Sequence, residues 1–372
     1  MEEKRVAAIV TEYRPRSHAD VIVGKLVAPY LLDGVLTQPR LRVASLFTDQ
    51  IAAQDLSRQI AAEHAIPIAE TIEQALTLGG SSLAVDGVVL VGEHGDYPTN
   101  DLGQKLYPRR RLFEAIVETM RKHGQFVPIF SDKHLSYSWE NARWMYDTAL
   151  ALGIPLLAGS SLPVTWRQPP CTVPAESEIG EALGIAHGPL DAYGFHALEM
   201  VQCMVERRRG GETGVTAVRC VSGPAVKKAA DEGVWSSDLF SAAAARLGVS
   251  DPAALIERAT DPTAFVVEYG DGLRVTVLML NGAVSEFAFA GRIDGAVAST
   301  KFYLESQEPF GHFAFLVRAI EDLVLNGRPP YPVERTLLTT GILALTLESR
   351  YREGIRLPTP ELGVRYRIES DL

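Results

Sequence analysis

Cysteine is scarce in this sequence, and the few cysteines form no recognisable ligand pattern. Three occur among 372 residues, and none stands in a CxxC or other zinc-binding spacing. An odd number of widely spaced cysteines is typical of buried, reduced thiols rather than of a disulfide framework. We therefore expect neither a disulfide-stapled secreted domain nor a zinc finger, and assign no catalytic role to Cys171, Cys203 and Cys220.

Long apolar runs and excess positive charge are also missing. No stretch approaches the length of a membrane span, and the segment after Met1 lacks the form of a signal peptide, which favours a cytoplasmic protein without a membrane partner. Lys and Arg number 36 against 46 Asp and Glu, a net charge of −10 that disfavours a nucleic-acid partner. The basic runs Arg109–Arg111 and Arg207–Arg209 are too short to change this expectation.

The first part of the chain alternates short β-branched runs with helical periodicity, which is typical of a parallel sheet covered by helices. It predicts an α/β, Rossmann-like, doubly wound domain over residues 1–160. The predicted strands are Val6–Thr11, Leu41–Phe47, Gly87–Val91, Phe126–Phe130 and Pro155–Ala158. The predicted helices are Asp20–Leu32, Ile51–His64, Ile72–Leu78, Arg111–His123 and Ser138–Leu152.

A second domain is predicted over residues 161–372, after a Pro-, Ser- and Thr-rich stretch from Ser160 to Ala175. Its pattern indicates an α+β domain with an open, mainly antiparallel sheet, and an exposed face of that sheet favours a homo-oligomer. The sequence leaves open whether the last helices of the chain pack against the first domain. The predicted strands are Val215–Val221, Phe265–Tyr269, Leu273–Leu280 and Val284–Ala290, and the predicted helices are Ala192–Arg208, His312–Asn326 and Arg335–Glu353.

The loop after the first strand has no glycine where a nucleotide site needs one. Between Arg5 and Gly24 no glycine occurs, although close approach of a pyrophosphate to backbone depends on glycine. Arg14 and Arg16, with His18 nearby, could instead hold an anionic or hydroxylated ligand. A solvated turn is an equal alternative.

Two further loops concentrate titratable groups at predicted strand ends. The first places Glu93, His94, Asp96 and Tyr97 directly after an apolar strand, an arrangement suited to an acid/base pair or to a divalent metal held by His94 and Asp96. A turn with locally satisfied hydrogen bonds is the alternative. The second is Asp132–His134, where a lysine at the mouth of a sheet could act as an acid or bind a carbonyl oxygen.

Together these segments resemble the Gfo/Idh/MocA family, whose members pair a Rossmann domain with an α/β sheet domain and mostly oxidise sugars or polyols with NAD(P). Asp132-Lys133-His134 is similar to the family's Glu-Lys-Pro motif, and Gly194 and His196 match its Asp-x-Gly-x-His helix pattern. Glu199 falls where the family often has a carboxylate. The resemblance covers nearly the whole chain and implies that Lys133 polarises a substrate oxygen while His196 exchanges its proton.

Several positions depart from the family pattern. Val10, Glu12 and Pro15 stand where the three glycines belong, and His134 replaces the motif's proline. Asp191 lies one place before the expected aspartate position, and Glu93-His94 replaces Pro-Asn. Asp49, by contrast, lies near the acidic residue that the family uses for the adenosine ribose, so the resemblance does not rule out a nucleotide.

The sequence thus predicts an enzyme that acts on a sugar, polyol or related hydroxylated small molecule by acid/base chemistry, with atypical or absent nicotinamide use. An NAD(P)-dependent dehydrogenase with an altered cofactor loop and a non-catalytic ligand-binding protein are the alternatives. The candidate residues are Lys133, His196, His94, Asp96 and His134 for catalysis, His18, Glu93, Tyr97, Asp132 and Glu199 for substrate, and Asp49, Arg14 and Arg16 for a cofactor.

Overall fold

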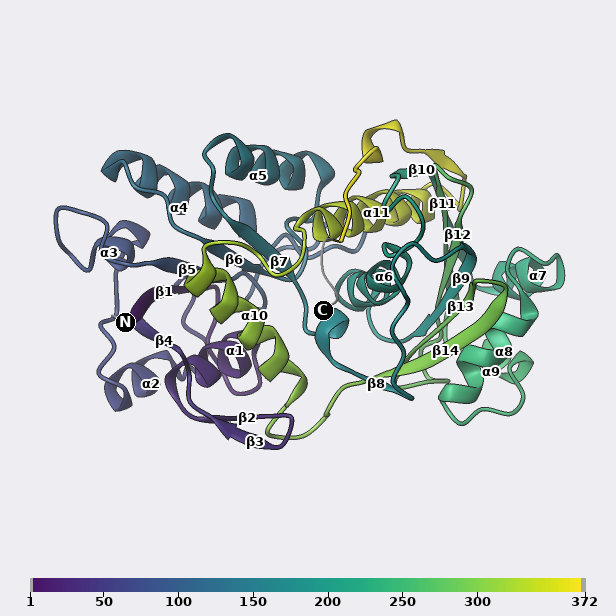
Figure 1. Cartoon of the computed structure of the whole chain (residues 1–372), viewed down its shortest axis with the longest axis horizontal. Helices are drawn as coiled ribbons and strands as arrows, with labels where there is room; N and C mark the ends of the chain where they lie inside the picture. Colours follow the sequence, from purple (N-terminus) through teal and green to yellow (C-terminus); the bar gives the residue numbers. More distant parts are fainter. Residues whose placement is uncertain (1–2, 369–372) are drawn as a thin grey trace. The chain divides into compact units, whose positions relative to one another are not determined.

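The chain forms two compact units, each assembled from separate stretches of sequence (Figure 1). The computed structural model describes residues 3–368. The first unit comprises Met1–Pro98, Lys105–Val164 and Glu305–Val333, and the second comprises Thr99–Gln104, Thr165–Leu304 and Glu334–Leu372. Within residues 3–368 no helix combines the length and apolar character needed to cross a bilayer.

The first unit is built on a five-stranded sheet in the order β4-β1-β5-β6-β7, and every neighbouring pair is parallel. This confirms the predicted Rossmann-like sheet. The strands are short and almost wholly buried because helices cover both of their faces. Their bounds are Lys4–Val10 for β1, Leu41–Thr48 for β4, Gly87–Val91 for β5, Ile129–Asp132 for β6 and Leu156–Gly159 for β7.

Helices α1 and α10 pack on one face of this sheet, and α3, α4 and α5 on the other (Figure 1). Alternate β1 residues Val6, Ala8 and Val10 share one hydrophobic core with α1 and α10, because successive side chains of a strand point to opposite faces. The helices span His18–Val27 (α1), Ser57–Glu63 (α2), Ile72–Thr77 (α3), Arg109–His123 (α4), Trp139–Ala151 (α5) and His312–Asn326 (α10).

The helix predicted over Asp20–Leu32 is too long. Helix α1 ends at Val27, two residues before Pro29, whose ring cannot continue a helix. The chain then forms a small antiparallel hairpin of β2 (Tyr30–Leu32) and β3 (Val35–Thr37), with Asp33 and Gly34 in the turn at positive φ.

The second unit contains an eight-stranded sheet in the order β15-β10-β11-β12-β9-β13-β14-β8. Only β12 and β9 pair in parallel, so the predicted mainly antiparallel sheet is confirmed. The strands span Trp166–Gln168 (β8), Ile179–Ala186 (β9), Val215–Ser222 (β10), Thr263–Tyr269 (β11), Arg274–Met279 (β12), Phe287–Ile293 (β13), Ala296–Tyr303 (β14) and Leu357–Pro358 (β15).

Helices cover both faces of this sheet (Figure 1). Helices α6 (Ala192–Val205) and α11 (Glu334–Tyr351) pack on one face, and α7 (Pro224–Asp231), α8 (Ser237–Arg246) and α9 (Ala253–Arg258) lie over the other. Helices therefore pack on both faces of the sheet over the described strands, and the homo-oligomer expected from the sequence stays a prediction. Single 3₁₀ turns occur at Leu162–Val164 and Pro360–Leu362.

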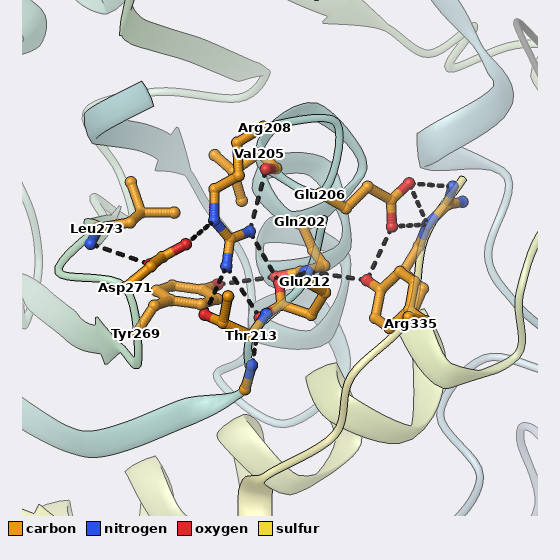
Figure 2. A network of polar contacts seen from close by, with 12 residues as sticks. Gln202, Val205, Glu206, Arg208, Glu212, Thr213, Tyr269, Asp271, Leu273 and Arg335 are labelled. Carbon is orange, nitrogen blue, oxygen red and sulfur yellow. Dashed lines mark hydrogen bonds and ion pairs between the residues drawn. The ribbon is translucent and has the colours of Figure 1, made fainter. Parts of the chain in front are cut away.

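A buried polar network holds the segment after α6 in place (Figure 2). The Arg208 guanidinium donates to Glu212 at 3.0 Å and to Asp271 at 2.6 Å, and Arg335 forms a buried ion pair with Glu206. The Tyr366 hydroxyl donates to Glu206 at 2.8 Å and so ties the C-terminal segment to the helix. We interpret this network as structural, because each carboxylate in it already has a cationic or hydroxyl partner.

Candidate functional site

The carboxyl ends of β1, β5 and β6 lie side by side, and the loops that follow them bring polar side chains together. Such an edge is the usual ligand position in an open parallel sheet. The residues that meet in the first unit come from four elements: Glu12, Arg14 and His18 after β1, Glu93 and His94 after β5, Arg109 from α4, and Asp132, Lys133 and His134 at the end of β6. The loops after β5 and β6, both singled out in the sequence, therefore converge with the loop after β1.

Glu93 is the centre of the most buried part of this site. Its carboxylate pairs with the Arg109 guanidinium and with Lys133 Nζ, 3.2 Å from Oε1, and these side chains are at most 5% exposed. Burial alone would raise the pKa of Glu93, but the charges of Lys133 and Arg109 outweigh burial and hold that pKa well below its usual range. The carboxylate therefore stays ionised and fixes the lysine at the end of β6.

Arg109 is a site residue that the sequence reading missed. It is fully buried at the start of α4 and also contacts His134, whose Nε2 lies 3.1 Å from Arg109 Nη1. Gly92 makes room for it, because a Cβ at that position would lie 2.6 Å from Arg109 Cγ. Two signals in the sequence could have identified Arg109: the glycine directly before Glu93 and the position of the arginine at the start of the next helix. Arg109 was overlooked because it stands in a run of three arginines, which is typical of a solvent-exposed surface.

Neither His94 nor His134 is suited to accept a proton. Arg14 Nη2 lies 3.2 Å from His94 Nδ1, and since a guanidinium only donates, that nitrogen must accept. The same argument applies to His134 and Arg109. Burial and the charge of His18 lower the pKa of His94 to about 3, and burial with Arg109 lowers that of His134 well below its usual value. Both imidazoles are neutral at pH 7, with one nitrogen occupied by an arginine.

His18 is in a different environment. Its Nδ1 lies 2.7 Å from Oδ2 of Asp132, a fully buried carboxylate at the end of β6. The ring also contacts His94 and Phe313 edge-on, with centroid distances of 5.5 and 5.2 Å. Three elements therefore fix the orientation of this imidazole.

Several buried polar atoms at the site make no hydrogen bond, and His94 Nε2 and Asp132 Oδ1 are the two that bear on a ligand. In the part of the chain that the structure describes, neither His94 Nε2 nor Asp132 Oδ1 makes a hydrogen bond. With Nδ1 of His94 accepting from Arg14, Nε2 carries a hydrogen and is a donor, while Asp132 Oδ1 is an acceptor. Buried polar groups are rarely left unpaired, so these atoms indicate a place for a ligand that offers both donors and acceptors.

The backbone at the site is strained. Arg16, His94 and Lys133, one from each of three strand-end loops, have φ values of 62°, 70° and 63°. Side chains other than glycine seldom adopt this left-handed conformation, and it costs on the order of 1 kcal/mol or more at each position. Such strain persists where surrounding contacts hold the backbone in place. Here the left-handed backbone directs the side chains of His94 and Lys133 toward Arg14 and Glu93.

Asp49 is already engaged. Tyr97 Oη donates to its carboxylate at 2.6 Å, and the Arg111 guanidinium donates to both of its oxygens at 2.7 Å. Burial and the bond to Asp49 raise the pKa of Tyr97. Asp96 does not join this group: its side chain is exposed, and its backbone bonds to Gln50.

The loop after β1 satisfies its own polar groups. Ser17 Oγ accepts from the amide of Asp20, and Asp20 Oδ2 accepts from the amide of Arg16 at 2.8 Å. Tyr13 is fully buried in the core shared with α1, where it occupies volume next to the loop backbone. Arg16 itself is exposed. The start of α1 therefore already carries a carboxylate and a hydroxyl where a phosphate would bind.

The predicted metal ligands do not form a metal site. His94 faces Arg14, Asp96 points to solvent, and among residues 3–368 no group of three or more His, Cys, Asp or Glu side chains is arranged to hold an ion. The suggestion of a metal held by His94 and Asp96 is therefore not supported by the observed positions.

His196 and Glu199 belong to the second unit. Both lie on α6, where the His196 ring meets Tyr193 and Phe287 edge-on at 5.6 and 6.5 Å. Glu199 is fully buried and accepts from Thr336 Oγ1 at 3.3 Å. The roles of both residues stay predictions from the family resemblance.

Comparison with known proteins gives a fold but no close relative. No family model matches the sequence, and no curated protein matches it. Solved structures match over nearly the whole chain. GenD2 from gentamicin A biosynthesis, solved in complex with NAD, is 14% identical with a TM-score of 0.58, covering 96% of this chain and 97% of its own.

A myo-inositol dehydrogenase from Corynebacterium glutamicum is 11% identical with a TM-score of 0.57, over 95% of this chain and 98% of its own. The UDP-N-acetylglucosamine 3-dehydrogenase GnnA from Acidithiobacillus ferrooxidans is 14% identical with a TM-score of 0.53, over 94% and 97%. These neighbours are Gfo/Idh/MocA-family dehydrogenases, so the resemblance read from the sequence is confirmed for the fold.

Proposed function

We propose that this protein is an enzyme that moves protons on a sugar, polyol or related hydroxylated small molecule, with little or no use of nicotinamide. The observation that carries the proposal is the buried group in which Lys133, Glu93 and Arg109 are fixed at the sheet edge. A lysine so placed polarises a substrate oxygen and stabilises negative charge that develops on it.

The unpaired atoms at the site support a polyhydroxylated substrate. A hydroxyl group is both donor and acceptor, so adjacent hydroxyls can accept from His94 Nε2 and donate to Asp132 Oδ1. The half-buried and buried cations of the site already have carboxylate partners: Arg14 with Glu12 at 2.5 Å, and Lys133 and Arg109 with Glu93. A neutral ligand suits this charge balance better than a pyrophosphate does.

A dinucleotide held in the ordinary way does not fit these residues. Asp20 occupies the amide end of α1, Tyr13 fills the space beside the loop, and Asp49 is held by Arg111 and Tyr97. Each contact removes a group that the family would use for the cofactor. We therefore derive no step through nicotinamide.

The alternative is an NAD(P)-dependent dehydrogenase with an altered loop. It is favoured by the position of Asp49 directly after β4 and by a fold neighbour solved with NAD. Calorimetric titration with NAD(H) and NADP(H) separates the two functions: dissociation constants in the micromolar range would contradict our proposal and support the alternative.

Proton transfer is tested by solvent exchange. In D₂O, NMR should show deuterium entering carbon positions of at least one compound in a panel of aldoses, ketoses and uronic acids. Lys133→Met should reduce that exchange by about 100-fold or more, whereas Lys122→Met, at an exposed lysine paired with Glu73, should leave it unchanged. Binding of a panel compound without any exchange would indicate a non-catalytic ligand-binding protein.

A further inference from the structure

His18 has a buried carboxylate as its partner. Asp132 Oδ2 lies 2.7 Å from Nδ1, and a carboxylate oxygen accepts in this contact, so Nδ1 carries the hydrogen. That tautomer leaves the lone pair on Nε2. A carboxylate in this position also stabilises the imidazolium that forms when Nε2 takes a proton.

Other histidines of the first unit are in different environments. His94 and His134 each accept from an arginine, and burial with the charges of Lys25 and His18 lowers the pKa of His312 to about 3. His123 also faces a carboxylate, Glu73 at 3.3 Å, but Glu73 is 44% exposed. His123 is the last residue of α4, at the opposite end of the helix from Arg109, which lies at the site. His123 is therefore a natural control.

The surroundings of His18 connect it to the lysine. Asp132 and Lys133 are consecutive, and His94, whose pKa is lowered mainly by burial, contacts the His18 ring. The groups that face or electrostatically influence the His18 ring are Asp132 at the end of β6, His94 and Glu93 after β5, and His312 and Phe313 at the start of α10.

We propose that His18 is the general base of this enzyme and that Asp132 is its positioning residue, acting on a hydroxy-carbonyl compound. His18 Nε2 takes a proton from the hydroxyl-bearing carbon next to the carbonyl. The electron pair of that C–H bond forms a C=C bond, and the carbonyl oxygen becomes an enediolate oxygen stabilised by Lys133. The imidazolium then returns the proton to carbon, so the step needs no oxidant or reductant. This assignment depends on the proposed function.

The first test needs no substrate. Long-range ¹H–¹⁵N spectra of the full-length chain at pH 8 report which ring nitrogen of each histidine carries hydrogen, and His18→Asn identifies the His18 signal. We expect the Nδ1–H tautomer for His18 in the wild type, and its loss or mixing in Asp132→Asn. An Nε2–H tautomer in the wild type would overturn the assignment, whatever the activity.

The second test uses the deuterium exchange described above, with folding of each variant checked by thermal denaturation. His18→Asn should lower exchange by about 100-fold or more, and His123→Asn by less than about twofold. Asp132→Asn should lower the rate and shift its pH profile, which a structural role would not do. If His18→Asn does not fold, His18→Gln replaces it.

The outcomes separate the two proposals. Exchange that survives His18→Asn but is lost in Lys133→Met would overturn the role of His18 and leave the proposed function standing. No exchange with any panel compound in the wild type would overturn the proposed function and the step assigned to His18 with it, even where the tautomer is the expected one.

Discussion

Arg208 and Arg209 are neighbours in the chain but lie in opposite environments. The Arg208 side chain is 3% exposed between Glu212 and Asp271, whereas Arg209 is 66% exposed and pairs with an equally exposed Glu178. Removing one partner of a buried ion pair strands the other charge, whereas exposed pairs contribute little. We expect Arg208→Met to lower the free energy of unfolding by about 3–5 kcal/mol and Arg209→Met by less than about 1 kcal/mol, measured by urea denaturation. Equal losses would show that the network in Figure 2 is not a stabilising feature.

The buried histidines should make the protein acid-sensitive. The pKa of His312 falls from 6.5 to about 3 on folding, so the unfolded state binds a proton first as the pH drops. This residue's contribution is fully present above pH 6.5 and is lost between pH 6.5 and about 3; by pH 5 the loss is about 2 kcal/mol. Urea denaturation at pH 7 and pH 5 should show that His312→Leu loses about 2 kcal/mol less stability than the wild type. A control without a titrating group, Leu150→Ala at an exposed position of α5, should keep the wild-type pH dependence.

The residue types of the site could be predicted from the sequence, but their partners could not. Glu93, Asp132 and Lys133 were recognisable because strand ends of a parallel sheet converge. Which charge meets which depends on backbone details such as the positive φ of His94 and Lys133 and the space at Gly92. His94 consequently looked like a base in the sequence, and His18 looked like a binding residue.

Among the elements, strong periodicity decided which ones the sequence could predict. Helix α10 begins and ends at the predicted residues, because its apolar stripe ends at the left-handed Gly327. Strand β9, at the centre of the second sheet, was missed because Gly180 and Gly184 interrupt its pattern. Gly184 is required there, since a Cβ would lie 2.8 Å from Val201 and 2.9 Å from Met200.

The missed helices α7–α9 cover one face of the second sheet, and their packing can be tested at Leu239. This fully buried α8 residue lies in the core formed with β9 and β13. Leu239→Ala should lower the free energy of unfolding by about 2–5 kcal/mol because it opens a cavity. Leu150→Ala, at a 68% exposed leucine on α5, should change it by less than about 0.5 kcal/mol. A small effect at Leu239 would mean that packing of these helices on the sheet contributes little to the free energy of unfolding.

At the scale of the whole molecule, the fold tolerates more sequence change than the site does. The chain keeps a two-unit fold at 9–14% identity to its neighbours, because many different apolar residues can fill the same layers. The site does not have that freedom, since each charge needs its own partner. A fold resemblance therefore supports the architecture here, whereas the function has to be argued from Lys133, His18 and their contacts.

The first unit should fold only when its last segment is present. Helix α10 contributes Phe313, Leu316 and Ile320 to the core that also contains α1 and β1, although 152 residues (160–311) separate it from the end of β7. A fragment of residues 1–160 would expose that apolar surface, and we expect it to show poor NMR dispersion and no cooperative thermal transition. The matched control joins residues 1–164 to 305–333 through a flexible linker, which should restore both signals. A cooperative melt of the short fragment would show that α10 is dispensable, and would place the stability of this unit in the sheet and its remaining helices alone.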